Sequence, residues 1–307
     1  MALFSLFKSN GPTGFGYNST AEDVTAGLAL TGKTILVTGC TSGLGAEACR
    51  VLSLRGAHVL GTARTQEAAN SACARLPNKG TGYACDLADP KSVRACVEQI
   101  RSDGHRLDAI ICNAGIMALP KLQKAHGYEL QFFTNHIGHF MLVTGLLDSL
   151  ADDGRVVMLS SMAHAQAPKG GIQFDNLGGE HGYNAWANYG QSKFANLLFA
   201  RELQHRFAGT KRTAYAVHPG VIHTNLARNA GVGVQAFFTI AGPLFLKTIP
   251  QGAATEVFAA VHPKALAFAG QYLADCNAAT PRKDAEDAAL ARKLWSVSEQ
   301  IVQGLPA

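Results

Sequence analysis

The sequence predicts an α/β fold: a single doubly wound domain in which a mostly parallel sheet of about seven strands is flanked by helices. From Thr34 onward, short apolar runs alternate with longer amphipathic segments. A strand that is apolar throughout is covered on both faces, and a helix between successive strands makes them parallel. The runs expected to form strands are TILVT, AHVLGT, TGYACDL, DAIICN, RVVMLS, TAYAVHP and GQYLA.

Helices are expected between these runs, and an extension is expected before them. Stretches such as LGAEACRVLSLRG, DPKSVRACVEQIRSDG and YGQSKFANLLFARELQHRF have the mixed pattern of helices that are buried on one side. Residues 1–30 are rich in Gly, Ser, Thr and Asn and show no sustained period. We therefore expect an N-terminal extension at 1–30, packed on one domain that spans residues 31–307.

Composition and charge exclude several classes of protein. With 47% hydrophobic and 16% charged residues, the chain can bury a large core, and its net charge of +5 comes from scattered basic residues. The sequence contains no run of Lys and Arg of the kind that indicates nucleic-acid binding. The seven cysteines are widely spread without a Cys-x-x-Cys pair, so we expect no metal or redox site, and buried free thiols in a reducing compartment.

Targeting segments are not evident. The start MALFSLFKSN lacks the apolar core of a signal peptide, and no later stretch approaches the roughly 18 apolar residues of a membrane span. We therefore expect a cytoplasmic protein without a transmembrane span. Docking on a membrane or partner through the N-terminal extension stays open.

The stretch VTGCTSGLG, Val37 to Gly45, joins the first strand to a helix. A helix N-terminus that follows a glycine turn offers unpaired N–H groups and a positive dipole end, which suit a pyrophosphate. Gly39, Gly43 and Gly45 would permit a tight turn, close backbone approach and tight helix packing, and Ser42 could donate a hydroxyl. A tight turn without a ligand is the alternative for a glycine loop taken alone.

Four further motifs follow in order, and together the five resemble the short-chain dehydrogenase/reductase family. They are TGCTSGLG at 38–45, CNAG at 112–115, LSS at 159–161, YGQSK at 189–193 and HPGVIHT at 218–224. The resemblance covers residues 34 to about 225 and implies a Rossmann fold and an oxidoreductase. Within the family, the chain looks most like the retinol dehydrogenases, the WW-domain oxidoreductase and the 32 kDa protein of the chloroplast translocon, because of STAEDVTAGLALTGKTILVTG, SSMAH and LWSVSEQIV.

The catalytic residues implied by the resemblance are Ser161, Tyr189, Lys193 and Asn135. Tyr189 and Lys193 are four apart on a helix and so share one face. A phenol has an unperturbed pKa of about 10, and a nearby ammonium together with an oxidised nicotinamide would favour the phenolate. Tyr189 would thus exchange a proton with the carbonyl or alcohol oxygen. Ser161, rather than Ser160, would hold that oxygen.

Asn135 and two histidines near these catalytic residues each allow more than one interpretation. By resemblance, Asn135 would anchor a proton-relay water, although a helix-capping or core amide is the alternative. His164 and His181 lie in the long segment between Ser161 and Tyr189. No metal-ligand spacing accompanies these histidines, so we interpret both as loop surface.

The end of the second strand favours NADP(H) as the cofactor. NAD-binding folds usually place an Asp or Glu there, whereas this chain has Thr62, Ala63 and then Arg64. A guanidinium can bind a 2′-phosphate with two hydrogen bonds, although an ordinary surface arginine is the alternative. The full set of expected cofactor contacts, taken from the resemblance, is Gly39, Thr41, Ser42, Gly43, Leu44, Gly45, Arg64, Asp86, Leu87, Asn113, Ala114, Gly115, Tyr189, Lys193, Pro219, Gly220 and Thr224.

Residues 226–250 lie where the family places its substrate lid. This segment contains Phe237, Phe238 and the run Leu244 to Leu246, and such an apolar lid suits a hydrophobic aldehyde, ketone or alcohol. Packing of the same residues on the sheet or on a second subunit of a homo-oligomer stays open. An NADP(H)-binding redox sensor or assembly partner with little turnover is the alternative function.

Overall fold

A computed structural model describes residues 9–222 and 246–306, and its centre is an eight-stranded sheet in the order β10-β9-β8-β7-β4-β1-β2-β3. Neighbouring strands are parallel except β9 and β10. The strands are β1 (Thr34–Thr38), β2 (His58–Ala63), β3 (Thr81–Ala84), β4 (Leu107–Cys112), β7 (Leu150–Leu159), β8 (Thr213–His218), β9 (Tyr272–Ala274) and β10 (Asn277–Ala278). The doubly wound fold predicted from the apolar runs is confirmed.

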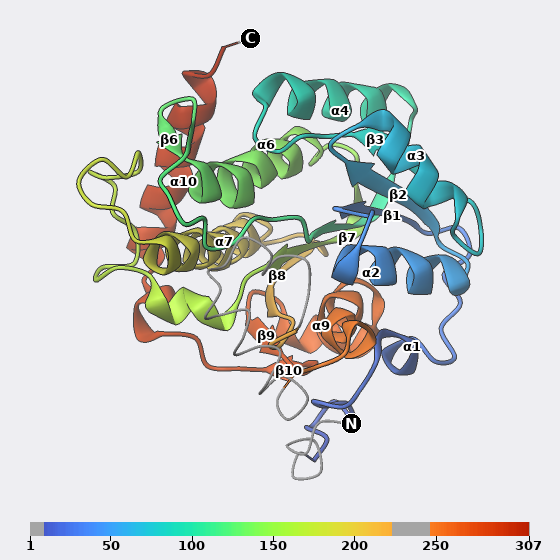
Figure 1. The fold of residues 1–307 in the computed structure, drawn as a ribbon. Coiled ribbons are helices and arrows are strands. Elements are labelled where there is room, and N and C mark those ends of the chain that lie inside the picture. The colour runs from blue at the N-terminus through green and yellow to red at the C-terminus, as the bar shows by residue number, and fades with distance from the viewer. Residues whose placement is uncertain (1–8, 223–245, 307) are drawn as a thin grey trace.

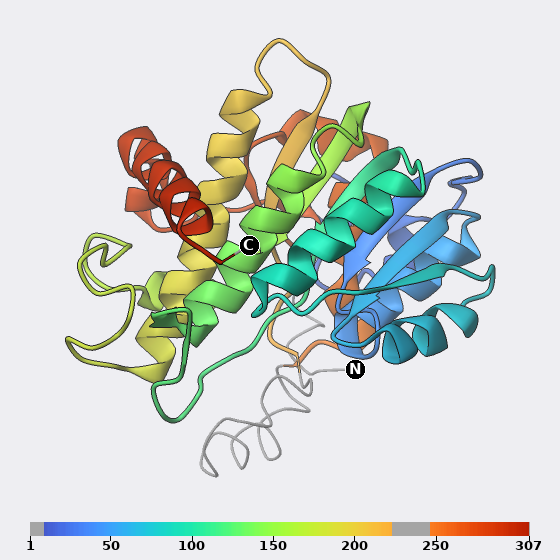
Figure 2. The ribbon, with the colours of Figure 1, turned by 90° about the horizontal axis from the view of Figure 1, so that it is seen from above.

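Helices cover both faces of the sheet, which explains why its strands are apolar throughout (Figure 1). One face carries α2 (Gly43–Leu54), α3 (Gln66–Ala74) and α9 (Ile249–Val261). The other carries α4 (Pro90–Ser102), α6 (Gly138–Gly145) and α7 (Ala185–Arg206), with α10 (Ala288–Gln303) packed on the outside of α7. Figure 2 shows α4, α6 and α7 side by side on this second face.

The remaining elements are short. They are the helices α1 (Ala21–Val24) and α5 (Leu130–Phe132), the hairpin of β5 (Lys124–Ala125) and β6 (Tyr128–Glu129), the π-helix η2 (Phe133–Ile137) and the 3-10 helices η3 (Met162–Gln166), η5 (Pro263–Phe268) and η6 (Lys283–Glu286). No helix in the described ranges has the length and apolar character needed to cross a bilayer.

Side-chain caps fix where several helices begin. Asp89 caps α4 just before Pro90, and Asn184 accepts hydrogen bonds from the backbone of Trp186 and Ala187 at the start of α7. Each such cap satisfies N–H groups that have no partner within the helix and contributes about 1 kcal/mol. The cap at Asn184 fixes the helix that carries Tyr189.

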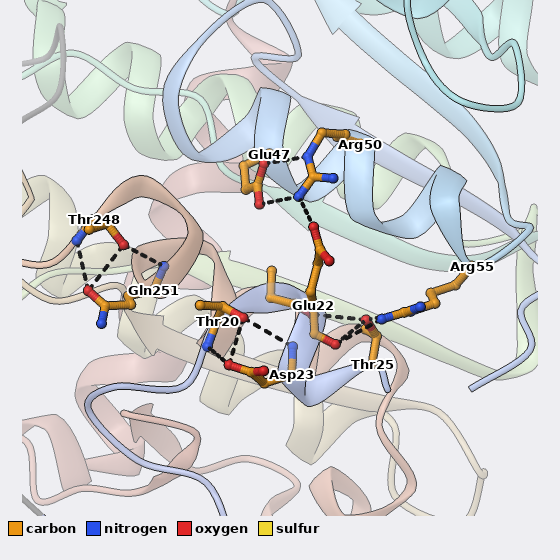
Figure 3. A network of polar contacts seen from close by, with 10 residues as sticks. Thr20, Glu22, Asp23, Thr25, Glu47, Arg50, Arg55, Thr248 and Gln251 are labelled. Carbon is orange, nitrogen blue, oxygen red and sulfur yellow. Dashed lines mark hydrogen bonds and ion pairs between the residues drawn. The ribbon is translucent and has the colours of Figure 1, made fainter. Parts of the chain in front are cut away.

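The described part of the N-terminal extension packs on α2 and α9, and Figure 3 shows the polar contacts that join it to Arg50 and Arg55. Thr20 and Asp23 form a capping box at α1. The Arg50 guanidinium of α2 binds the Glu22 carboxylate at 2.5 Å, and Arg55 donates to the Thr25 hydroxyl at 3.0 Å. The domain boundary near residue 30 stays a prediction, but these contacts attach the extension to the face that carries α2.

The antiparallel edge strand β10 was not among the predicted strands. It follows β9 through a two-residue turn in which Asp275 and Cys276 both have positive φ, 51° and 61°. Such a turn normally has Asn, Asp or Gly at its first position and Gly at its second, and here Cys276 occupies the second. A strand of two residues after an atypical turn leaves no recognisable pattern.

Candidate active site

The predicted site lies where the strand order reverses. β1 pairs with β2 on one side and with β4 on the other, so the loops that follow β1 and β4 leave the sheet in opposite directions. In open α/β sheets, ligands bind in the crevice at the carboxyl ends of the strands at such a point. The glycine loop follows β1 and the CNAG motif follows β4.

The glycine loop has the backbone that its sequence predicts. Gly39 and Gly43 have φ of 76° and 61°, in the left-handed region that side chains disfavour. A Cβ at Gly45 would lie 2.3 Å from the Gly39 carbonyl oxygen, whereas a Cβ at Gly43 would meet nothing within 4 Å. Gly45 therefore permits the helix to pack on the loop, and Gly43 borders open space.

The side chains of this loop leave the N-terminus of α2 accessible. Thr41 and Ser42 are at the surface, while Leu44 is buried. Ser42 is the N-cap residue, but its side chain makes no capping hydrogen bond. The first N–H groups of α2 and the Ser42 hydroxyl are thus arranged as a phosphate site would require.

The CNAG motif ties the ends of β1 and β4 together. The Asn113 amide nitrogen donates to the Thr38 carbonyl at 2.8 Å, and the Ala114 N–H donates to the Thr38 hydroxyl at 3.0 Å. A Cβ at Gly115 would lie 3.0 Å from the Asn135 oxygen and 3.5 Å from the Lys193 Nζ. The motif therefore joins the glycine loop to the predicted catalytic residues, and Asn113 has a structural role in addition to its predicted one.

Asn135 lies on the π-helix η2 and is fully buried. Its side chain accepts from the Ile116 N–H at 2.8 Å and donates to the Ile116 carbonyl and to the Ser192 hydroxyl at 2.9 Å each. Its backbone carbonyl is 2.9 Å from the His139 Nδ1. The side chain thus holds the loop after Gly115 against α7, and its predicted role in proton relay stays a prediction.

Tyr189 and Lys193 lie on the same side of α7, as their spacing predicts, and both are buried. The Lys193 Nζ donates to the Leu159 carbonyl at 3.0 Å and lies 5.8 Å from the centre of the Tyr189 ring. Burial lowers the pKa of Lys193 to about 8, against an attraction from Glu256 that raises it.

The phenol of Tyr189 is held neutral in this structure. Burial raises its pKa to about 12, and the nearby Ser161 side chain acts in the opposite direction. The proton therefore stays on Tyr189 at neutral pH. The expected lowering of this pKa by Lys193 together with an oxidised nicotinamide stays a prediction.

The two serines after β7 have different surroundings. The Ser160 hydroxyl is buried and donates to the Lys193 carbonyl at 2.8 Å. The Ser161 hydroxyl accepts from the Ala163 N–H at 3.1 Å and lies near enough to the Tyr189 phenol to lower its pKa. The choice of Ser161, rather than Ser160, as the residue that holds the substrate oxygen stays a prediction.

His164 is not on a loop surface, so that interpretation of its environment was wrong. The residue is only 4% exposed, and its ring contacts the Ser161 carbonyl and the backbone of Arg282. Arg282 is more than a hundred residues away in the sequence, so the sequence around His164 could not reveal this burial. His181, by contrast, is exposed in a turn, as expected.

The remaining predicted cofactor residues follow the carboxyl ends of the strands or lie outside the described residues. Arg64 follows β2 and is exposed, Asp86 follows β3, and Leu87 is buried against Gly138 of α6. Pro219 and Gly220 follow β8, and a Cβ at Gly220 would lie 2.6 Å from the Lys247 side chain. Thr224 and most of the predicted lid, residues 226–245, lie outside the described residues.

Glu256 is a buried charged residue that sequence reasoning did not single out. It lies on α9 in the apolar run GAATEVFAAV, and neither of its carboxylate oxygens has a hydrogen-bond partner among the described residues. Burial raises its pKa to about 8, while Lys193 acts to lower it. A glutamate within a helix that is apolar on all sides was the available indication.

Known proteins resemble the chain over most of its length. The family model described as short chain dehydrogenase matches residues 33–233. The chloroplastic short-chain dehydrogenase TIC 32 A of Brassica napus is 42% identical, with 96% of this chain and 97% of the relative covered. Human retinol dehydrogenase 14 is 38% identical over 88% and 86% of the two chains.

Two solved structures are also similar to this chain in fold. An uncharacterized protein from Mycobacterium paratuberculosis is 33% identical at a TM-score of 0.73, with 91% of this chain and 97% of that one covered. A blue fluorescent protein from a metagenomic library, solved in complex with NADPH, is 26% identical at a TM-score of 0.64, with 80% and 96% covered.

Proposed function

Because the chain belongs to the short-chain dehydrogenase family, whose members bind nicotinamide cofactors, we propose that it is an NADP(H)-dependent oxidoreductase. It would interconvert a carbonyl and an alcohol on a hydrophobic substrate. The observation that carries this proposal is the pairing of the buried Tyr189 with the buried Lys193, whose Nζ lies 5.8 Å from the centre of the Tyr189 ring, one helical turn away on α7.

The residues at the switch point fit a bound dinucleotide. The open space at Gly43, the uncommitted Ser42 hydroxyl and the N-terminus of α2 suit its pyrophosphate. Lys193, held at the Leu159 carbonyl, would contact the nicotinamide ribose. When bound, the nicotinamide would supply the hydride in reduction and accept it in oxidation.

The chain's own residues would handle the proton and the orientation of the substrate. Ser161 donates to the substrate oxygen and holds it beside the phenol. Tyr189, which burial keeps protonated, gives its proton to that oxygen during reduction and removes it during oxidation. The Lys193 ammonium stabilises the phenolate left after donation.

The preference for NADP(H) over NAD(H) rests on charge at the end of β2. Thr62 and Ala63 are neutral, and the exposed Arg64 guanidinium has no ion pair among the described residues. It is therefore available to a 2′-phosphate. The NADPH complex of the blue fluorescent protein supports the same choice.

An apolar substrate is supported by the described rim of the site. Met162, directly after Ser161, is 57% exposed; Val221, shortly before the lid, and Ile249, in its last residues, are 37% and 36% exposed. Backbone pairing of Ile222 with Lys247 brings the segment before the lid together with the end of the lid. The relatives include retinol dehydrogenases, and the retinol of their name is a hydrophobic alcohol.

Turnover with a panel of apolar aldehydes and ketones tests the proposal. Consumption of NADPH that is faster than that of NADH is expected with at least one member. Tight NADPH binding without turnover would favour the alternative, a redox sensor or assembly partner, and an absence of binding would reject both. Homo-oligomerisation and a cytoplasmic location stay predictions.

A further inference from the structure

The ring of His164 bridges two backbone groups that are distant in the sequence. Its Nδ1 lies 2.6 Å from the Ser161 carbonyl oxygen, and its Nε2 accepts from the Arg282 backbone N–H at 3.2 Å. A carbonyl only accepts and a backbone N–H only donates. The two partners therefore assign the proton to Nδ1 and the lone pair to Nε2, which is the neutral imidazole.

The side chain of Arg282 holds the same segment at its other end. Its guanidinium donates to the Ala167 carbonyl at 2.8 Å and is oriented by the Asp284 carboxylate at 2.6 Å. It also lies 5.0 Å from the centre of the Phe194 ring, next to Lys193 on α7. Arg282, directly before η6, thus contacts the middle of η3 at the His164 ring and its C-terminal end at Ala167. The His164 ring extends this connection to Ser161, directly before η3.

We propose that His164 is a positioning residue for Ser161, which it connects in its neutral form to Arg282. This inference rests on the proposed function, since it concerns the serine that would hold the substrate oxygen. His164 touches the backbone of Ser161 and not the reacting atoms. Without the ring, the carbonyl keeps only the backbone N–H of His164, at 3.0 Å, and Ser161 loses the connection to Arg282 that fixes its position relative to Tyr189.

Protonation of His164 would break this connection. An imidazolium presents a second N–H at Nε2, where the Arg282 N–H already points, and two donors cannot form a hydrogen bond. The other ionisable groups around the ring are the Arg282 guanidinium, the Asp284 carboxylate, Tyr272 of β9 at 5.0 Å and His218 of β8. Burial is the largest influence and lowers the pKa of His164, so the connection persists at neutral pH.

Three variants separate positioning from simple loss of stability. His164→Leu removes both contacts, whereas His164→Asn keeps an N–H donor near the place of Nδ1 and does not titrate. His181→Asn, in the exposed turn, is the matched control. We expect kcat to fall by about 10- to 100-fold in His164→Leu, because a small misplacement of a reacting group has that cost. His164→Asn should recover part of the loss, and His181→Asn should match the wild type.

Three measurements besides the rate at neutral pH identify the mechanism. The dissociation constant for NADPH should stay within twofold in all variants, because His164 does not touch the cofactor site. In the wild type, ¹⁵N shifts of the His164 ring should show the neutral Nδ1–H form at neutral pH, and the fall of kcat in acid should be weaker in His164→Asn.

The outcomes distinguish this inference from the proposed function. A wild type that binds NADPH without turning over any carbonyl removes the proposed function, and the ring shifts then decide the tautomer alone. A wild type with turnover and an equally active His164→Leu overturns the inference, as does an Nε2–H tautomer. If His164→Leu does not fold, the comparison of His164→Asn with His181→Asn decides.

Discussion

Replacement of Glu256 by glutamine should stabilise the protein increasingly as the pH rises. The pKa of Glu256 is raised to about 8 in the folded chain, against an ordinary value of 4.5. Between these values, the unfolded chain releases a proton that the folded chain retains, so ionisation favours unfolding. The wild type therefore loses stability as pH rises from about 4.5 to about 8, and a glutamine, which does not ionise, does not.

The size of the effect follows from the two pKa values. One pKa unit corresponds to about 1.36 kcal/mol, so the shift from 4.5 to about 8 costs the wild type about 3 kcal/mol more at pH 7.5 than at pH 5. The free energy of unfolding of Glu256→Gln minus that of the wild type should rise by this amount over the same interval. The two proteins should differ least below pH 4.5, where the carboxyl is mostly neutral in both the folded and the unfolded chain.

Equilibrium unfolding in urea at a series of pH values, without cofactor, measures this difference. Urea is uncharged and leaves the ionic interactions unscreened. Glu98→Gln, at an exposed position of α4, is the matched control and should follow the wild type at every pH. Parallel stability curves for the wild type and Glu256→Gln would refute the assignment of a neutral, buried Glu256 at neutral pH.

Two further predictions concern the cofactor. Lys193→Ala should lower kcat by at least about 10²-fold and weaken NADPH, because the ammonium both supports the phenol and would contact the ribose; an unchanged dissociation constant would contradict the second role. Arg64→Ala should weaken NADPH by about 1.5 to 3 kcal/mol, or about 10- to 150-fold in the dissociation constant, with little effect on NADH. Adding Ala63→Asp should then turn the preference toward NADH, which fluorescence titration of both cofactors checks; equal losses for NADPH and NADH in Arg64→Ala would mean that the arginine only shapes the loop.

The parts of the fold that sequence predicted are those with local causes. The apolar runs became strands because each is covered on both faces, and the glycine loop needs left-handed backbone at Gly39 and Gly43. The helical spacing of Tyr189 and Lys193 likewise places them on one side of α7. In each case the relevant residues are neighbours in the sequence, so their pattern alone carries the information.

The parts that sequence did not predict depend on contacts between distant segments. His164 is buried because Arg282, from the segment before α10, reaches back to it. Glu256 is isolated because α9 places it within the core, opposite Lys193 across the sheet. Neither the burial of a histidine in a polar loop nor the environment of one carboxyl can be deduced from the residues beside it.

Replacement of Tyr189 by phenylalanine tests the central claim most directly. The variant keeps the ring that packs against Trp186 but lacks the proton that the account assigns to catalysis. Steady-state NADPH consumption, with any carbonyl substrate that the wild type accepts, should fall by about 10² to 10⁴-fold. The dissociation constant for NADPH, measured by fluorescence titration of the same samples, should stay nearly unchanged. A Tyr189→Phe protein that binds NADPH and keeps about half of the wild-type rate, well outside the range for acid-base catalysis, would contradict the account.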